Sequence, residues 1–217
     1  MNSKATILMV DDHPLFRKGI RQLIEMEEGL AIAGEAKNGE EALALAKVDE
    51  PDLILLDLNM QGMDGLGTLR ALRAAGVNSR IIMLTVSDSE ADVINCIKAG
   101  ADGYLLKDME PEDILEKIKE ATMGKMAISE KLTQILASAL RRPGNTVSDP
   151  SASLTSREYE ILTRIAQGHS NKVIARDLDI SDGTVKVHVK HILKKMDMKS
   201  RVEAAVWLVN RKSGHPG

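Results

Sequence analysis

Short apolar runs alternate with amphipathic stretches along roughly the first 125 residues. The runs are rich in leucine, isoleucine and valine without polar alternation, which is typical of parallel strands covered on both faces. They lie at 7–10, 30–33, 53–56, 81–85 and 104–106. Helical patterns fall between and after them, at 15–26, 39–46, 66–75, 91–98 and 111–123. This alternation predicts an open, doubly wound α/β fold with a five-stranded parallel sheet.

Glycine and proline mark several helix ends in this region. Gly76 and Gly100 stand where helix C-termini are expected. We expect the last helix to begin at Asp108, with Pro111 in its first turn. In such sheets the functional crevice lies outside the carboxyl ends of the strands.

The rest of the chain has a different pattern and a different charge. Residues 129–141 predict a further helix, and residues 142–153 are rich in Pro, Gly, Ser and Asp, as linkers are. Four short helical patterns and no strand signal follow. We therefore predict an α/β domain at 1–126, a linker helix and flexible linker at 127–153, and a separate all-α domain at 154–217.

Charge divides along the same line. The first 142 residues carry 17 Lys and Arg against 24 Asp and Glu, whereas the remainder carries 12 against 8. The basic C-terminal part is therefore the candidate for binding a polyanion.

Composition excludes several classes of protein. No apolar run approaches the ~18 residues of a membrane span, and the first run ends in Asp11-Asp12, unlike a signal peptide. We expect no membrane partner and a cytoplasmic location. The single cysteine, Cys96, excludes an internal disulfide and a cysteine-based zinc site, and predicts a small buried apolar side chain.

Polar residues follow four of the predicted strands: Asp11 and Asp12, Asp57, Thr85 and Lys107. One aspartate in such a place is usually only a turn or helix cap, but the whole set is hard to explain that way. Three carboxylates brought together repel one another unless a cation neutralises them. Mg²⁺ suits oxygen ligands and phosphate chemistry.

The same set suits phosphoryl transfer. The Asp57 carboxylate follows a buried strand and can act as a nucleophile that forms an acyl phosphate. The metal and Lys107 would offset charge on the transferring group, and the Thr85 hydroxyl would donate a further hydrogen bond.

Residues 5 to about 125 resemble the receiver domain of two-component response regulators, which has a flavodoxin-like fold. The resemblance rests on Val10-Asp-Asp-His-Pro14, Leu55-Leu-Asp-Leu-Asn-Met60, Thr85-Val-Ser87 and Tyr104-Leu-Leu-Lys107. It implies phosphorylation of Asp57 by a histidine kinase, phosphate contacts from Thr85 and Lys107, and a rotamer change of Tyr104. It also implies Mg²⁺ binding by Asp12, Asp57 and the Asn59 carbonyl, with Asp11 assisting through water.

One position departs from that family. Gln61 stands where the family usually has proline. We expect this difference to change the shape of the loop after Asp57 without changing the chemistry.

The C-terminal part predicts a helix-turn-helix. Thr155 and Glu158 form a capping box at the start of its first helix. Ser170 is expected to cap the second helix, and a turn at 179–181 leads to the third.

The third helix has an apolar face and a basic face. Its core stripe is Val185, Val189, Ile192, Leu193 and Met196. Residues 183–201 contain six Lys and Arg, and on a second helix of this motif such a run favours DNA contact over a merely solvated face. We expect Lys186, Val187 and Lys190 to read base edges, with Thr184 nearby, and Lys172, Lys194 and Lys199 to contact phosphates. His188 and His191 lack nearby partner ligands and predict surface positions.

A last helix follows a second capping pattern, Ser200 to Glu203, and carries the only tryptophan, Trp207. It either closes the small core or also supplies a dimer face. This half resembles the LuxR/FixJ class of output domains. The whole chain is similar to the nitrate/nitrite response regulators (NarL and NarP type), on the run Thr184–His191 and on Gly100–Pro111.

These observations lead to one hypothesis: a phosphorylation-controlled transcription regulator that binds double-stranded DNA as a homodimer and acts with RNA polymerase. The resemblance implies that the unphosphorylated receiver covers the recognition helix. An aspartate-dependent phosphatase would need a second acid two residues after the nucleophile, where this chain has Asn59, so we expect no substrate turnover. A switch acting on a protein partner is the other alternative, and the basic helix argues against it.

Overall fold

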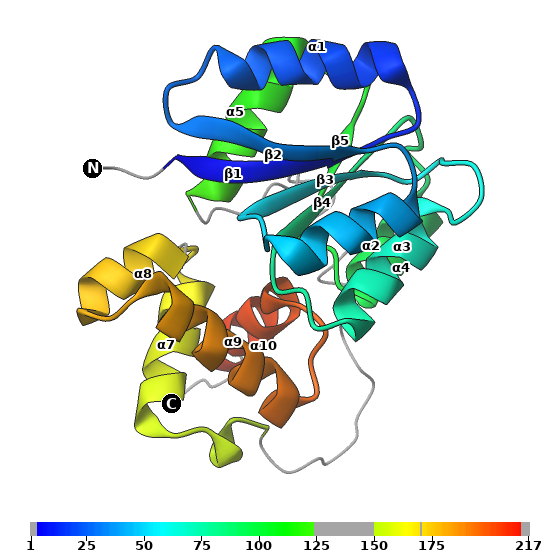
Figure 1. The fold of residues 1–217 in the computed structure, drawn as a ribbon. Helices are drawn as coiled ribbons and strands as arrows, with labels where there is room; N and C mark the ends of the chain where they lie inside the picture. The colour runs from blue at the N-terminus through cyan, green and yellow to red at the C-terminus, as the bar shows by residue number, and fades with distance from the viewer. Residues whose placement is uncertain (1–3, 124–149, 170, 214–217) are drawn as a thin grey trace.

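The computed structural model describes residues 4–123, 150–169 and 171–213. They form an α/β part (residues 4–123) and a helical part (residues 150–213), which lie side by side (Figure 1). The predicted helix at 129–141, most of the predicted linker and the predicted cap Ser170 lie outside the described residues.

The α/β part contains the predicted sheet. Its strands are β1 (Ala5–Val10), β2 (Leu30–Ala36), β3 (Leu53–Asp57), β4 (Arg80–Thr85) and β5 (Gly103–Leu106). All neighbours are parallel, and the order β2-β1-β3-β4-β5 confirms the doubly wound fold. β3 lies at the centre and is buried along its whole length, as its unbroken apolar run predicts.

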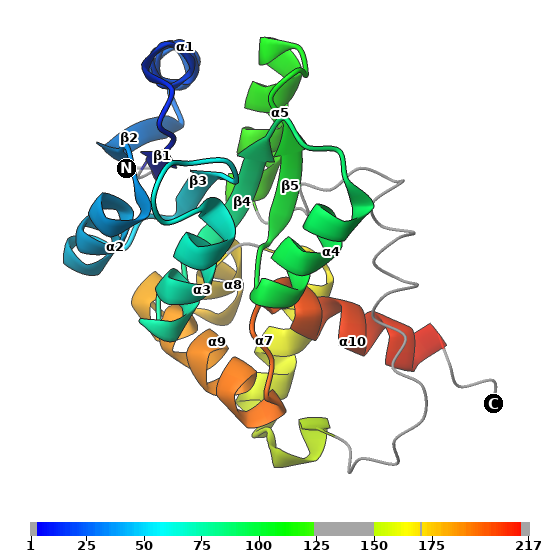
Figure 2. The ribbon, with the colours of Figure 1, turned by 90° about the vertical axis from the view of Figure 1, so that its right-hand side faces the viewer.

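Helices cover both faces of the sheet (Figure 2). Helices α1 (Pro14–Glu25) and α5 (Pro111–Thr122) bury one set of apolar side chains, including Ile24 and Ile118. Helices α2 (Gly39–Val48), α3 (Gly65–Ala74) and α4 (Glu90–Ala99) bury the other, including Leu69 and Cys96. Cys96 is buried and free, as predicted.

The predicted start of the last helix in the α/β part is wrong. Helix α5 begins at Pro111 and is preceded by the N-cap residue Glu110, so Asp108 lies in the turn before it. Proline at the first helical position has its φ already set and needs no N–H partner, which fixes the start there. Gly76 (φ 80°) and Gly100 (φ 109°) have the left-handed backbone expected where α3 and α4 end.

The helical part consists of a 3₁₀ turn, η1 (Pro150–Ser153), followed by four helices. These are α7 (Ser156–Ala166), α8 (Asn171–Leu178), α9 (Asp182–Met196) and α10 (Arg201–Ser213). Apolar side chains from all four helices form its separate core. Helices α8 and α9, joined by a short turn with Asp179 in the left-handed region, are the predicted helix-turn-helix. No helix among the described residues is long and apolar enough to cross a membrane.

The helical part lies against the amino ends of the strands, opposite to the edge where Asp57 is found. Lys172 of α8 reaches Asp52, the residue before β3, with 3.3 Å between Nζ and Oδ2. A small recess there is lined by Asp52 and Arg80 from one part and by Lys172 and Arg201 from the other. The two parts therefore meet in this structure at the side of the sheet opposite to Asp11, Asp12 and Asp57.

Candidate functional site

Three of the predicted residues meet at the carboxyl edge of the sheet. Asp57 is the last residue of β3, Asp11 directly follows β1 and Lys107 directly follows β5. The Lys107 amino group lies 2.7 Å from Oδ2 of Asp11 and 2.8 Å from Oδ2 of Asp57. All three side chains are less than one-tenth exposed. One buried lysine thus bridges two buried carboxylates. The three residues meet because the carboxyl ends of parallel strands lie at the same edge of the sheet.

Burial determines how the Asp57 carboxyl ionises. Removal from water raises its pKa, because the charged form loses hydration. The hydrogen bond and charge of Lys107 oppose that rise, while the Asp11 charge adds to it. The net direction is upward, because the loss of hydration outweighs the stabilisation of the charged form by Lys107.

Asp12 and His13 complete an acidic pocket. His13 Nδ1 lies 2.8 Å from Oδ1 of Asp12 and 3.3 Å from Oδ1 of Asp11. Atoms of Asp11, Asp12, His13 and Asp57 all lie within 4.8 Å of one another, close enough to bind one metal ion. Three carboxylates beside one lysine leave two surplus negative charges, which a divalent cation matches. The oxygen-rich donor set suits Mg²⁺ better than it suits zinc.

Asn59 connects Asp57 to Thr85. Its N–H donates to Oδ1 of Asp57 (3.2 Å), and its side-chain amide donates to the Thr85 hydroxyl (3.3 Å). Thr85 ends β4, is fully buried, and its hydroxyl also accepts from the Ser87 N–H (3.1 Å). All five polar residues predicted at strand ends, together with Asn59, are therefore gathered at one edge.

Tyr104 lies inside the α/β part, next to the same loop. Its side chain is buried among the apolar residues on the α4 side of the sheet. Its hydroxyl donates to the Ser87 carbonyl at 2.9 Å. Burial, with smaller effects from Cys96 and Asp92, raises the pKa of the Tyr104 phenol to about 12. Ser87 thus links the Thr85 hydroxyl on one side to the Tyr104 hydroxyl on the other.

Two close contacts at this edge were not predicted from the sequence. The Gln61 N–H donates to Oδ2 of Asp12 at 3.1 Å. Gly65, the first residue of α3, packs so tightly that an added Cβ would lie 2.0 Å from the Asp57 carbonyl oxygen. The Gly65 position carries a sequence signal, because a glycine that opens a helix often marks a close backbone approach. The Gln61 contact uses only the backbone N–H of that residue and has no such signal.

The basic face of α9 has the predicted arrangement on its own helix. The stripe residues Val185, Val189, Ile192 and Met196 are buried, and Leu193 packs partly against the same core. Val187, Lys190, Lys194 and Thr184 are exposed, whereas Lys186 is held 3.7 Å from Asp182 one turn earlier. His191 is exposed and His188 partly so.

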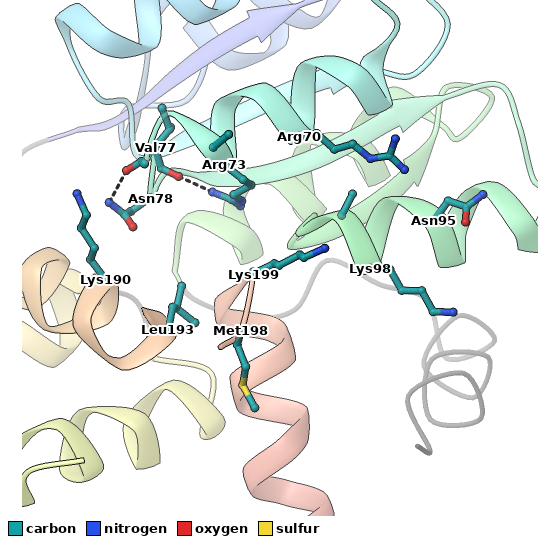
Figure 3. A pocket seen from close by; sticks show the side chains of 13 residues that line it. Arg70, Arg73, Val77, Asn78, Asn95, Lys98, Lys190, Leu193, Met198 and Lys199 are labelled. Carbon is teal, nitrogen blue, oxygen red and sulfur yellow. Dashed lines mark hydrogen bonds between the residues drawn. The ribbon is translucent and has the colours of Figure 1, made fainter. Parts of the chain in front are cut away.

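Three of the predicted DNA-contacting lysines face the α/β part. Lys190 of α9 and Lys199, before α10, line a cavity with residues of α3 and α4 (Figure 3). Lys172 of α8 also points toward that part, through its contact with Asp52. Lys190, Lys199 and Lys172 therefore do not lie on one open surface in this arrangement.

Comparison with known proteins gives the class. Residues 7–119 match the response regulator receiver domain, and residues 152–208 match the luxR family of bacterial regulatory proteins. The chain therefore belongs to the response regulators that join a receiver domain to a LuxR-type DNA-binding domain.

Individual relatives narrow the class further. The chain is 56% identical to the nitrate/nitrite response regulator protein NarL of Escherichia coli strain K12, over 94% of each chain. It is 48% identical to the nitrate/nitrite response regulator protein NarP of the same strain, over 95% of each. Among solved structures it is similar to the response regulator ChrA of a heme-sensing two-component system, at 30% identity and a TM-score of 0.51, covering 98% of this chain and 99% of that one.

Proposed function

We propose that Asp57 accepts a phosphoryl group from a sensor histidine kinase and that this event controls DNA binding by α9. The observation that carries the proposal is the Lys107 bridge between Asp57 and Asp11 at the carboxyl edge of the sheet. An aspartate that only caps a turn or a helix needs no lysine beside it, whereas an aspartate that accepts a phosphoryl group needs a fixed positive charge there.

The chemistry follows from the side chains. An Asp57 carboxylate oxygen attacks phosphorus, an oxygen–phosphorus bond forms, and the phosphorus–nitrogen bond to the kinase histidine breaks. Lys107, which lies 2.8 Å from Asp57, would contact a phosphate oxygen, and the Thr85 hydroxyl, which Asn59 links to Asp57, would contact another. Asp11, Asp12, Asp57 and the Asn59 carbonyl would hold Mg²⁺, which supplies charge neutralisation for the transferred group.

Thr85 and Tyr104 provide a route away from the pocket. The Thr85 hydroxyl accepts from the Ser87 N–H, and the Ser87 carbonyl accepts from Tyr104. A Thr85 hydroxyl that turns to the phosphate gives up the Ser87 contact, so the loop and the Tyr104 rotamer change together. We propose that this change reaches the helical part and weakens its docking.

Docking of the two parts supports a masked resting state. Lys190 and Lys199 line the interdomain cavity, so a DNA duplex cannot reach both while the α/β part lies there. In the released state, Lys186, Val187 and Lys190 would read bases with Thr184 beside them, and Lys172, Lys194 and Lys199 would contact phosphates. We further propose a homodimer on DNA, contact with RNA polymerase, a cytoplasmic location and, from the relatives, a nitrate or nitrite signal.

Footprinting with and without a small phosphodonor tests the proposal. Wild-type protein should protect DNA at lower concentration when the donor is present, and Asp57→Asn should not respond. An equal response of both proteins would contradict it. Turnover of a chromogenic phosphate ester, which we expect to be absent because Asn59 occupies the acid position, separates a regulator from a phosphatase.

A further inference from the structure

The cavity between the two parts is lined by positive charge. It has a volume of about 650 Å³, within the range of ~300–1,000 Å³ that is typical of small-molecule sites. Arg70 and Arg73 of α3 and Lys98 of α4 line it from the α/β part, and Lys190 and Lys199 line it from the helical part. No aspartate or glutamate lines it within the described chain.

Arg73 already has an ion pair and hydrogen bonds within the α/β part. Its guanidinium lies 2.6 Å from the buried Asp102 carboxylate and donates to the carbonyls of Gly100, Val77 and Ser79. Its charge is therefore balanced, and its donors are used. It serves as one wall of the cavity and holds the end of α3 against β5.

The other four cations have no such balance. Within the ranges that the structure describes, Arg70, Lys98, Lys190 and Lys199 form no ion pair. Figure 3 shows Lys199 extending from the helical part toward the α3 and α4 side, where Arg70 and Lys98 lie. Like charges that line one cavity repel one another, and an anion placed between them would relieve that repulsion.

We propose that this cavity is a binding site for a small polyphosphate. Several linked phosphate groups match cations spread over three helices and a loop better than one phosphate does. A cavity of about 650 Å³ is too small to hold a DNA duplex, so in this arrangement of the two parts the site suits a small molecule. Asn95 adds an amide group to the lining for a remaining phosphate oxygen, whereas the Asn78 amide already donates to the Gly76 carbonyl at 2.9 Å.

Such a ligand would act on the arrangement of the two parts. It contacts Arg70 and Lys98 on one side and Lys199 on the other, so it binds the docked arrangement better than the separated one. By linkage it then favours the docked state and opposes DNA binding. This consequence rests on the masking proposed above, whereas ligand binding itself does not.

Calorimetric titration of the full chain with tripolyphosphate, in buffer freed of divalent cations, tests the site. We expect saturable binding near one equivalent. Binding should weaken about tenfold in the double variant Arg70→Gln, Lys98→Gln, which removes two of the cations proposed to contact the ligand and no predicted DNA contact. The control Lys18→Gln, Lys47→Gln removes the same charge from exposed positions on α1 and α2 and should bind as the wild type does.

Two results would overturn the site: no saturable binding, or equal loss in both double variants. A gel-shift competition then tests the consequence. Tripolyphosphate should lower the DNA affinity of the wild type more than that of the Arg70→Gln, Lys98→Gln variant. Equal lowering in both would show simple competition for the recognition helix and would contradict the docking effect. Failure of Asp57→Asn to alter the phosphodonor response would contradict the proposed function alone.

Discussion

The backbone N–H of Gln61 donates a hydrogen bond to Oδ2 of Asp12, 49 positions away in the sequence. Proline, usual at this position in the family, has no N–H and cannot make this contact. We expected Gln61 to alter only the shape of the loop, but its backbone holds a carboxylate of the acidic pocket. The departure from the family pattern therefore bears on the proposed metal site.

Gln61→Pro should weaken Mg²⁺ binding, because loss of a partner that orients a metal ligand typically costs 10–100-fold in affinity. We expect the low end, about 10-fold, since the contact is solvent-exposed. Gln61→Ala keeps the N–H and should bind Mg²⁺ like the wild type. Titration of Mg²⁺ followed by NMR of the pocket residues measures both. Equal weakening by alanine would assign the effect to the glutamine side chain.

Gly65 has room for a hydrogen only. A Cβ there would lie 2.0 Å from the Asp57 carbonyl oxygen and 2.6 Å from the Leu58 Cα, and both neighbours are backbone. Gly65→Ala should therefore destabilise the α/β part by about 1–3 kcal/mol and displace the proposed acceptor. It should also slow phosphorylation of Asp57 by a phosphodonor.

Gly19→Ala is the matched control for that change. Gly19 lies within α1, and an added Cβ meets nothing within 4 Å. Alanine there should stabilise the helix by about 0.5–1 kcal/mol and leave phosphorylation unchanged. Urea denaturation and a phosphorylation time course compare the two variants, and similar effects from both would show that Gly65 has no special role.

The sheet and its polar edge were predictable because burial leaves a clear pattern. A parallel strand covered on both faces needs an unbroken apolar run, and the residue that ends it must lie at the common edge. Asp57, Thr85 and Lys107 were found this way. Strand β2 was predicted to end at residue 33 but continues to Ala36, through Glu35. It is one of the two edge strands, so Glu35 can pair there with Arg21 at 2.7 Å.

The contacts that the sequence could not predict are those without a side-chain pattern. The Gln61 N–H would be the same for any residue except proline. Whether Lys190 and Lys199 are accessible depends on how the two parts dock. The helical periodicity of the sequence contains no information about docking. Residue types on one helix therefore predict a DNA-binding face, but not its accessibility.

Asp52→Asn should loosen the docked arrangement. Asp52 accepts hydrogen bonds from the N–H and hydroxyl of Thr6 and lies 3.3 Å from the Lys172 amino group. Asparagine can retain the Thr6 contacts but loses the ion pair. A partly exposed pair contributes about 0.2–1 kcal/mol, so unphosphorylated protein should bind DNA up to about 5-fold more tightly.

Asp49→Asn is the control, since it removes the same charge from an exposed position three residues away. Gel shifts at low and high salt measure the effect. The difference between the two variants should shrink as salt rises, because screening weakens exposed ion pairs. A gain in DNA affinity that is the same for both would reflect net charge, not docking.

Glu158 should make the helical part sensitive to acid. Burial of the Glu158 carboxyl opposes ionisation, but hydrogen bonds from Lys195 and from the Thr155 N–H and hydroxyl outweigh it and lower its pKa to about 2. Because this pKa is below the ordinary value of ~4.3, the contribution of ionised Glu158 to stability is complete above that value. It is lost as the pH falls from about 4.5 toward 2.

Glu158→Gln should therefore destabilise the helical part by about 1–2 kcal/mol at pH 7, through the weakened capping box and the lost Lys195 pair. The difference from the wild type should shrink steadily below pH 4.5. Trp207 is the only tryptophan and packs against the core of this part, so its fluorescence during urea denaturation reports the transition. A difference that stays constant down to pH 3 would show that the Glu158 charge contributes nothing and that only the shape of the cap matters.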